Sequence, residues 1–403
     1  MEKMRKMKPS GVEWIGDIPQ EWEVLPHKYV MRKYKNICEH YNGEDIISLT
    51  MNGVIIRDLN AGGKMPTTFD GYQYVEPEDL LLCLFDIDVT PRCVGLVKNY
   101  GITSPAYSRF KLFSGYFNSY YDYLLRMIDD RKVFIHLSKN LRSSLTENDF
   151  GAILTIAPPL VEQQRIAEYL DRKCAEIDSV ISKTKATIEQ YKALKQSVIT
   201  QAVTKGIRPD QPMKDSGIEW IGEIPQEWEI SKLKYLCQMQ AGKNLTSEEI
   251  TSNGEYPVYG GNGIRGYYNE FNTVGSHLLV GRQGALCGNV HKVEGYFWAT
   301  EHCVVTLCSK LSYRDYLYYL LIAMNLNQYA SNTAAQPGLS VNMIQNVSTC
   351  IVPIDEQQEI ADYLDRKCAE IDRLIAAKEQ LLTELESYKK SVIYEYVTGK
   401  KEV

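Results

Sequence analysis

The stretch EQQRIAEYLDRKCAEID, residues 162–178, returns as EQQEIADYLDRKCAEID at residues 356–372, and fifteen of the seventeen positions are identical. Each copy opens a segment in which apolar residues recur in steps of three and four, without an internal proline or glycine. This near-heptad periodicity predicts two amphipathic helices of about 40 residues, each roughly 60 Å long. The residues expected to pack the two helices together are Ile166, Leu170, Ile177, Ile181, Ile188, Leu194, Ile360, Leu364, Ile371, Ile375, Leu382 and Leu385.

A second stretch is also duplicated. SGVEWIGDIPQEWEV at residues 10–24 returns as SGIEWIGEIPQEWEI at residues 216–230, with twelve of fifteen positions identical. The segments between the duplicated stretches, about 25–158 and 231–352, share no obvious similarity. The chain is therefore two half-units in which a constant frame encloses unlike inserts. A constant frame indicates that the same partner is met twice, whereas unlike inserts indicate two different binding tasks.

A long helix with one apolar stripe has to bury that stripe on another helix. The nearest candidate is its own duplicate, with a coiled coil between two copies of the chain as the alternative. Within one chain, the sequence alone allows a parallel or an antiparallel pair. An antiparallel pair would carry the two inserts to opposite ends of a rod, related by a pseudo-twofold axis.

The inserts are predicted to be mixed α/β, because strand-like apolar runs precede one amphipathic helix in each. The expected strands lie at 53–59, 79–85 and 92–99 in the first insert and at 256–261, 276–282 and 303–308 in the second. The expected helices cover 118–131 and 313–327. This shared order of elements indicates related folds under diverged sequences.

Proline and glycine mark the boundaries of these parts. Prolines just before residues 160 and 354 are typical of helix starts, and GIRPDQP at 206–212 indicates a linker. The signals divide the chain into a first α/β domain with its frame segment (1–158), a first long helix (159–207), a second α/β domain with its frame segment (208–352) and a second long helix (353–403).

Composition describes a soluble globular protein, with 44% hydrophobic and 24% charged residues. We expect no membrane span, since no apolar run approaches the roughly 20 residues that a span needs. The ten cysteines form no C-x-x-C pair, and reduced thiols fit a cytoplasmic protein. The net charge of −6 comes from the frame, because acidic and basic residues nearly balance in both inserts. This balance permits DNA binding through local patches without requiring it.

Two glycine-rich motifs lie in the second insert. GGNGIRG at 260–266 contains G-x-G-x-x-G, but the residues that follow do not start a helix, so a dinucleotide site is not expected. The motif is interpreted as a turn that presents Asn262, Arg265 and Tyr268 to DNA, with a plain surface turn as the alternative. GRQG at 281–284 presents Arg282 and Gln283, whose side chains match guanine and adenine, although an exposed arginine is more often simply solvated.

In the first insert, residues 90–110 interleave basic and aromatic side chains. Arg92, Lys98, Tyr107 and Arg109 are the candidates for DNA contact. Half-buried strands with polar outward faces produce the same pattern, so this alternative stays open.

No catalytic or metal site is predicted. His302, Cys303 and Cys308 match no standard spacing of metal ligands. The chain has no Gly-x-x-x-x-Gly-Lys-Ser/Thr phosphate loop and no Asn/Asp-Pro-Pro-Tyr tetrapeptide of an amino-methyltransferase.

The frame resembles that of the specificity subunits of type I restriction-modification enzymes. The resemblance is carried by SGVEWIGDIPQEWEV and its copy, by PPLVEQQRIAEYLDRKCAEID and its copy, and by the long helices after them. The ends of the inserts, SSLTENDF and PGLSVNMI, also fit the family. VPID at 352–355 departs from the APPLV at 157–161 of the first half, which affects only the entry to the second helix.

The resemblance implies that each insert is a target recognition domain for one half of a split double-stranded DNA sequence. It also implies that the helix pair acts as a ruler and docks two methyltransferase subunits, which carry S-adenosylmethionine, while separate motor-nuclease subunits use ATP and Mg²⁺. This chain itself is then a non-catalytic subunit that binds no cofactor. The alternatives are a self-sufficient nuclease or DNA methyltransferase with the same recognition domains, and a coiled-coil adaptor with no DNA role.

Overall fold

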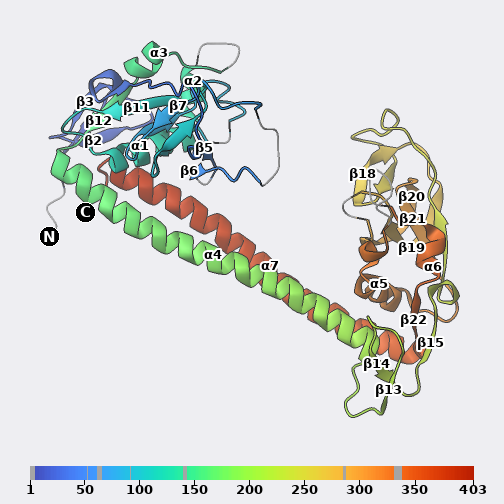
Figure 1. Ribbon diagram of the computed structural model, residues 1–403. Coiled ribbons are helices and arrows are strands. Elements are labelled where there is room, and N and C mark those ends of the chain that lie inside the picture. The colour runs from blue at the N-terminus through green and yellow to red at the C-terminus, as the bar shows by residue number, and fades with distance from the viewer. Residues whose placement is uncertain are drawn as a thin grey trace. The chain divides into compact units, whose positions relative to one another are not determined.

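The computed structural model describes residues 5–51, 53–60, 66–90, 92–138, 143–284, 287–330 and 338–403 (Figure 1). The chain forms two compact units: unit 1 consists of Met1–Thr184 with Gln380–Val403, and unit 2 of Lys185–Glu379. Each long helix contributes to both units. Pro91 and Pro337, which belong to two motifs discussed above, lie outside the described residues.

The two predicted long helices are confirmed as α4 (Leu160–Lys205, 46 residues) and α7 (Ile354–Val397, 44 residues). Pro159 and Pro353 stand directly before them, where a missing N–H costs no helical hydrogen bond. Gly206, with a φ of 72°, takes the left-handed conformation just after α4 that commonly ends a helix.

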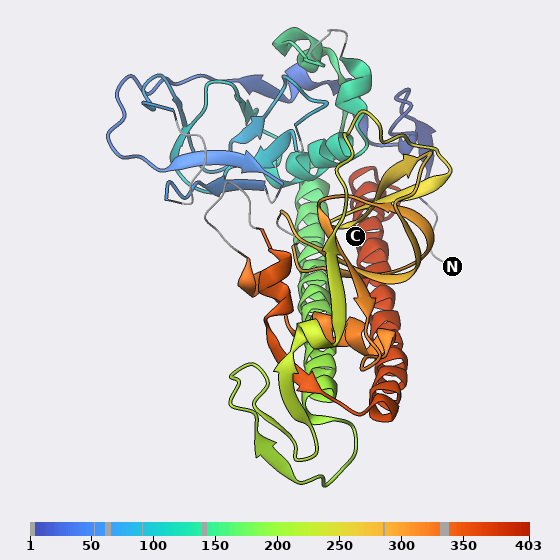
Figure 2. The same ribbon diagram turned by 90° about the vertical axis from the view of Figure 1, so that its right-hand side faces the viewer.

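The helix pair is intramolecular and antiparallel, which decides between the alternatives that the sequence left open. In unit 1 the ring of Tyr169 lies 4.3 Å from that of Tyr396, and Asp178 pairs with Lys389 at 2.6 Å. A later residue of α4 thus contacts an earlier residue of α7, so the two helical segments run in opposite directions. In unit 2 the ion pair between Lys195 and Asp372, also at 2.6 Å, is the duplicate of the Lys389–Asp178 pair, because each residue is exchanged for its counterpart in the other long helix. Figures 1 and 2 show the green α4 and the red α7 side by side.

The predicted packing stripe holds along most of both helices. The buried members are Ile166, Leu170, Ile177, Ile188, Ile360, Leu364 and Ile371, and the half-buried ones are Ile181, Ile375, Leu382 and Leu385. The prediction for Leu194 is wrong: its side chain is 48% exposed, while Ile199 is buried instead. At about 100° per residue, Leu194 lies six residues after Ile188 and so about 120° away from it around the helix, whereas Ile199, eleven residues on, returns to the same face.

Small antiparallel pairs shape the frame around the start and end of each insert. Their strands are β1 (Met7–Pro9) with β2 (Asp17–Pro19), β3 (Glu23–Pro26) with β12 (Leu154–Ala157), β13 (Met213–Asp215) with β14 (Glu223–Pro225), and β15 (Glu229–Lys232) with β22 (Ser348–Ile351). The β3–β12 and β15–β22 pairs bring the first and last residues of each insert together. Each insert is thus a closed module attached through one two-stranded sheet.

Two four-stranded sheets form the insert of unit 1. One has the order β4 (Met31–Lys33), β11 (Ser108–Leu112), β8 (Leu80–Leu82) and β9 (Val94–Leu96). The other has the order β7 (Gln73–Val75), β10 (Gly101–Thr103), β5 (Ile46–Thr50) and β6 (Gly53–Ile56).

One six-stranded sheet forms the insert of unit 2. Its order is β16 (Cys237–Ala241), β21 (Cys303–Cys308), β19 (Thr273–Gly281), β20 (Val290–Ala299), β17 (Tyr256–Gly260) and β18 (Gly263–Tyr268).

The two inserts share one topology, as their order of elements predicted. If β7 with β8 corresponds to β19, and β9 with β10 to β20, then both units have the same strand order and the same pairing directions. In unit 2 the matching point of the long hairpin holds Gly275 opposite Gly295, both with positive φ. Glycine adopts this positive-φ conformation at little cost. At the equivalent place in unit 1 the strands are interrupted, between β7 and β8 and between β9 and β10.

One helix of each insert packs against the long helices, namely α1 (Asn118–Asp130) in unit 1 and α5 (Arg314–Ala323) in unit 2 (Figures 1 and 2). The predicted strands and both predicted helices are confirmed, but α5 ends at Ala323 because Asn325 takes a left-handed conformation. The shorter helices and 3₁₀ turns are α2 (Val133–Leu137), α3 (Glu147–Ala152), α6 (Val341–Gln345), η1 (His27–Tyr29), η2 (Leu233–Tyr235) and η3 (Leu326–Tyr329).

His27 in η1 is a fully buried histidine. Its ring stacks on Phe150, and Nδ1 lies 2.8 Å from the carbonyl oxygen of Ile153. Burial lowers the pKa of His27 to about 4, and the bond to Ile153 only partly opposes this effect. Since the unfolded chain binds the proton near pH 6.5, stability is fully present above that pH and is lost as the pH falls towards 4.

His27→Leu is expected to remove this pH dependence, because the equivalent residue of unit 2 is the buried Leu233. Wild-type protein should lose about 2–3 kcal/mol of unfolding free energy between pH 7 and pH 4.5 through His27, and the variant should not. Urea unfolding at both pH values measures the difference. His136→Gln, at an exposed histidine of the same unit, is the control. Equal losses in wild type and His27→Leu would contradict the prediction.

Candidate nucleic-acid interface

The frame seats both inserts through the same set of hydrogen bonds. In unit 1, the indole N–H of Trp22 donates to Glu162 at 2.9 Å, and the first N–H of the α1 region, at Phe117, donates to Gln163 at 2.8 Å. Tyr123 of α1 donates to Asp171 of α4. The equivalent bonds of unit 2 join Trp228 to Glu356, Tyr313 to Gln357 and Tyr319 to Asp365. Identity within the duplicated stretches therefore has a structural cause in both units.

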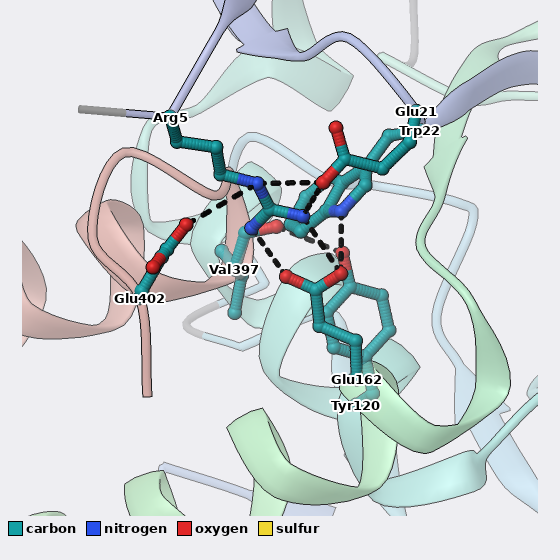
Figure 3. A network of polar contacts seen from close by, with 7 residues as sticks. All are labelled: Arg5, Glu21, Trp22, Tyr120, Glu162, Val397 and Glu402. Atoms are coloured by element: carbon teal, nitrogen blue, oxygen red, sulfur yellow. Dashed lines mark hydrogen bonds and ion pairs between the residues drawn. The ribbon is translucent and has the colours of Figure 1, made fainter. Parts of the chain in front are cut away.

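A charged network in unit 1 joins the two ends of the chain (Figure 3). Arg5, whose side chain is 15% exposed, forms ion pairs with Glu21, Glu162 and Glu402. In unit 2, residues 206–212 link the end of α4 to β13 covalently, and Gln211 takes the place of Arg5. In unit 1, the ion pairs of Arg5 thus hold the segment before β1 beside the residues that follow α7. In unit 2, the peptide backbone itself connects the equivalent segments.

The two glycine motifs of the second insert, which residues 267–280 separate in the sequence, meet in unit 2. GGNGIRG forms the turn of the β17–β18 hairpin, which excludes the strand-to-helix turn of a dinucleotide site. GRQG follows the end of β19, and a Cβ on Gly281 would lie 2.1 Å from the carbonyl oxygen of Gly261. The two backbones therefore touch, which only glycine permits here.

Together with the β20–β21 turn and Asn289, which directly precedes β20, polar residues of these motifs form a surface that we call the Gly-loop cluster. Its members are Asn262, Arg265, Arg282, Gln283, Asn289, Glu301 and His302. Asn289 donates to Asn262 at 3.1 Å, and Gln283 contacts His302, so the amides are held in place. Amides and guanidinium groups are among the groups that read base edges in the major groove.

The two arginines of the Gly-loop cluster differ in exposure. Arg265 is exposed and lies over Gly260, where an added Cβ would come within 2.5 Å of the arginine Cδ. Arg282 is half-buried, and its buried Nε has no hydrogen-bond partner among the described residues. Neither arginine forms an ion pair among the residues that the structure describes. Tyr268 is placed differently: it lies at the other end of β18, edge-on to Trp298.

His302 and Glu301 are members of the cluster that the sequence did not predict as DNA contacts. In the sequence, His302 stands out only beside Cys303 and Cys308, and Glu301 belongs to no motif. No local signal identifies them, since their proximity to Gln283 depends on the pairing of β19 with β21. Among the described residues, no group of three or more His, Cys, Asp or Glu side chains is placed to hold a metal ion.

The structure corrects the prediction for Arg109 in unit 1. Its side chain is 0% exposed and pairs with Asp79 at 2.5 Å and with Glu76 at 3.3 Å. It also donates to the carbonyl oxygen of Tyr74 and lies over the ring of Tyr34. Arg109 is therefore a buried structural residue that cannot reach DNA in the folded unit.

The other candidates of unit 1 do not form one cluster. Lys98 is exposed and Arg92 is half-buried. Both act on Asp122 of α1: burial raises the pKa of this carboxyl, while Arg126, Arg92 and Lys98 oppose the rise. Tyr107 packs partly into the small apolar cluster around β8. The alternative of half-buried strands with polar faces thus accounts for much of the pattern at 90–110.

The loops of unit 1 that correspond to the Gly-loop cluster have different chemistry. The loop after β8, at the place of GRQG after β19, exposes Phe85 and Val89. The turn between β5 and β6, at the place of GGNG, exposes Met51. At equivalent places the two units therefore expose different side chains, Phe85, Val89 and Met51 in unit 1 against Asn262 and Gln283 in unit 2, which suits the recognition of different ligands.

No helix among the described residues is long and apolar enough to span a membrane.

Comparison with known proteins gives one consistent family. The family described as "Type I restriction modification DNA specificity domain" matches residues 225–387. The type I restriction enzyme EcoprrI specificity subunit of Escherichia coli is 46% identical over 135 residues, which are 32% of this chain and 33% of that protein. The putative type I restriction enzyme MjaX specificity subunit of Methanocaldococcus jannaschii is 22% identical over 96% of this chain and 95% of its own length.

A solved structure shows the same fold over nearly the whole chain. A chain from a structure of complex assembly and conformational transition of the type I R-M system superimposes with a TM-score of 0.72 and covers 95% of this chain. The match covers 99% of that chain at 15% identity, so it supports the fold alone.

Proposed function

Because the chain belongs to the specificity-subunit family of type I restriction-modification enzymes, we propose that it binds double-stranded DNA and reads a target of two separated half-sequences. One observation carries the proposal. Two domains of one topology are seated by identical frame contacts, but they present different side chains at equivalent loops. To read two unlike sequences, a protein needs two domains that are held in the same way but carry different side chains on their DNA-facing loops.

The chain is proposed to act as a reader and scaffold without catalysis of its own. Type I specificity subunits work with methyltransferase and restriction subunits, and the duplicated frame supports the docking of two copies of the methyltransferase. S-adenosylmethionine, ATP and Mg²⁺ would then be bound by these partners. A cytoplasmic location follows from a DNA target in the cell.

The ruler role of the long helices belongs to the same proposal. The number of helical residues between the two recognition domains would set the gap between the half-sequences, since an α-helix rises about 1.5 Å per residue.

Selection from a DNA library tests the proposal. Duplexes with a long random region are incubated with the chain and its methyltransferase subunits, and the bound duplexes are sequenced. A motif of two short fixed sequences with a constant gap is expected. A single continuous motif, or no motif, would refute the proposal. Incubating the chain alone with Mg²⁺ and S-adenosylmethionine tests the enzyme alternative, for which DNA cleavage or methyl transfer would be evidence.

Arg282→Ala is expected to weaken discrimination in the second half-sequence. If the guanidinium reads a base, the preference for the correct base pair over the other three at one position should fall by about 1–3 kcal/mol. Competition binding with duplexes altered at single positions measures this loss. Arg208→Ala, at an exposed arginine that pairs with Glu359 in the same unit, is the control. A uniform loss on all sequences would show that Arg282 contacts phosphate instead.

A further inference from the structure

The backbone of the GRQG loop is held on two sides. The N–H of Arg282 donates to the carbonyl oxygen of His302 at 2.9 Å, and the N–H of Leu339 donates to the carbonyl oxygen of Arg282 at 2.9 Å. Gln283 forms an isolated bridge with Gly338. These backbone contacts with neighbouring loops therefore fix the position of the Gln283 backbone.

The side chain of Gln283 is also held, although it is exposed. Its amide oxygen is within hydrogen-bond distance of Nδ1 of His302. On the other side of the ring, Nε2 of His302 lies 3.1 Å from a carboxylate oxygen of Glu301. The side chains of His302 and Glu301 are only 36% and 33% exposed, so this arrangement is partly shielded from water. An exposed glutamine normally moves among many rotamers, and fixing one before binding lowers the entropy cost of recognition.

We infer that Glu301 and His302 are positioning residues that hold the Gln283 amide for reading the adenine of an A·T pair in the second half-sequence, an inference that rests on the proposed DNA-reading function. Adenine presents an N6 donor beside an N7 acceptor in the major groove, and a glutamine amide presents the matching oxygen and NH₂ group. An amide oxygen has two lone pairs, so one remains for adenine after the contact with His302.

The chain of contacts does not depend on one assignment of the amide. An ionised carboxylate only accepts hydrogen bonds, so the N–H at Nε2 of His302 donates to Glu301. With a proton on Nδ1 as well, the ring donates to the amide oxygen of Gln283. Without that proton, Nδ1 accepts from the amide NH₂. In both states the ring ties the amide in place and leaves one oxygen lone pair and one N–H free for a base.

Substitutions at the three positions separate reading from positioning. Gln283→Glu keeps the shape but loses the donors, so the preference for adenine at one position should fall about 10- to 100-fold and cytosine should become tolerated, because its N4 group donates to a carboxylate. His302→Phe keeps a ring but makes no hydrogen bond, and should flatten the preference at the same position by about tenfold. Glu301→Gln should do so by less, since an amide oxygen still accepts from the ring.

The readout is the set of sequences selected from the random duplex library by the chain with its methyltransferase subunits. Gln283→Ala with His302→Phe should be no worse at this position than Gln283→Ala alone, because His302 is proposed to act only through Gln283. Thermal unfolding checks that each variant folds. Glu248→Gln, at an exposed carboxylate of the same unit, is the matched control and should leave the selected motif unchanged.

The outcomes distinguish this inference from the proposed function. A wild-type chain that selects no two-part motif refutes both. A wild-type motif that Gln283→Glu leaves unchanged overturns the inference alone. If His302→Phe weakened the base preference at every position of the motif, or if Glu248→Gln had an equal effect, the contacts of His302 would have a purely structural role. Either result would also overturn the inference. A loss confined to one A·T position in one half, shared by the Gln283 and His302 variants, is the expected result.

Discussion

Arg109→Leu is expected to destabilise unit 1 by about 3–5 kcal/mol, because removing one partner of a buried ion pair leaves the other charge unpaired. Asp79, whose side chain is 2% exposed, would lose its 2.5 Å contact with the guanidinium. Burial already raises the pKa of Asp79, against the effect of Arg109, so this carboxylate depends on its partner. The neutral Val305 stands at the equivalent position of β21 in unit 2, which shows that the fold itself does not require a charge there.

Hydrogen exchange measured by mass spectrometry provides a local readout of this loss. Amides of β11 should exchange faster in Arg109→Leu, while amides of unit 2 should keep their protection. Arg109→Leu combined with Asp79→Asn should recover part of the stability, since the asparagine oxygen still accepts from the N–H of Glu76, a bond of 2.7 Å in the wild type. If Arg109→Leu instead kept its stability and lost only DNA binding, Arg109 would be a surface contact and the correction would be wrong.

Inserting seven residues after Ala186 and the same seven after Gln380 is expected to lengthen the gap between the half-sequences by about three base pairs. The two sites occupy equivalent positions in the duplicated helices. Seven residues keep the apolar stripe in register and add about 10 Å to each helix, and DNA rises about 3.4 Å per base pair. Both half-sequences should stay the same, because neither recognition domain is altered.

Sequencing of selected duplexes measures the gap in this variant. The same insertion in α4 alone is the control: it leaves the two helices unequal, and specific binding should be lost. Selection of the wild-type gap by the double insertion would show that the helices do not set the spacing.

The frame and the long helices were predictable because their signals are local and repeated. About 40 residues of uninterrupted period on one face admit few structures other than a long amphipathic helix. The prediction fails at Leu194 because two successive steps of three, from Ile188 through Tyr191, turn about 120° away from the apolar face. The local sequence does not show whether the two helices run parallel or antiparallel. Their direction depends on contacts between residues far apart in the chain, such as the Asp178–Lys389 ion pair.

The candidate site was only partly predictable. Both glycine motifs of the second insert were identified, but their contact depends on how the β17–β18 hairpin lies against the end of β19, which no short stretch encodes. Arg109 and Arg282 look alike in sequence as basic residues beside strand-like runs. Burial separates them: Arg109 is fully buried against Asp79, whereas Arg282 lies in a half-buried loop and forms no ion pair with the part of the chain that the structure describes. The strand β20 was missed because Glu294 and Gly295 interrupt its alternation of buried and exposed residues.

Exchange of one recognition domain tests most directly whether one duplicated scaffold carries two independent readers. Residues 27–153, enclosed by the β3–β12 pair, are replaced with the corresponding segment of another specificity subunit, and adenine methylation is mapped across the genome of cells that carry the chain and its methyltransferase. One half of the methylated sequence should change, while the other half and the gap remain as in the wild type. A change in both halves would contradict the independence of the two domains.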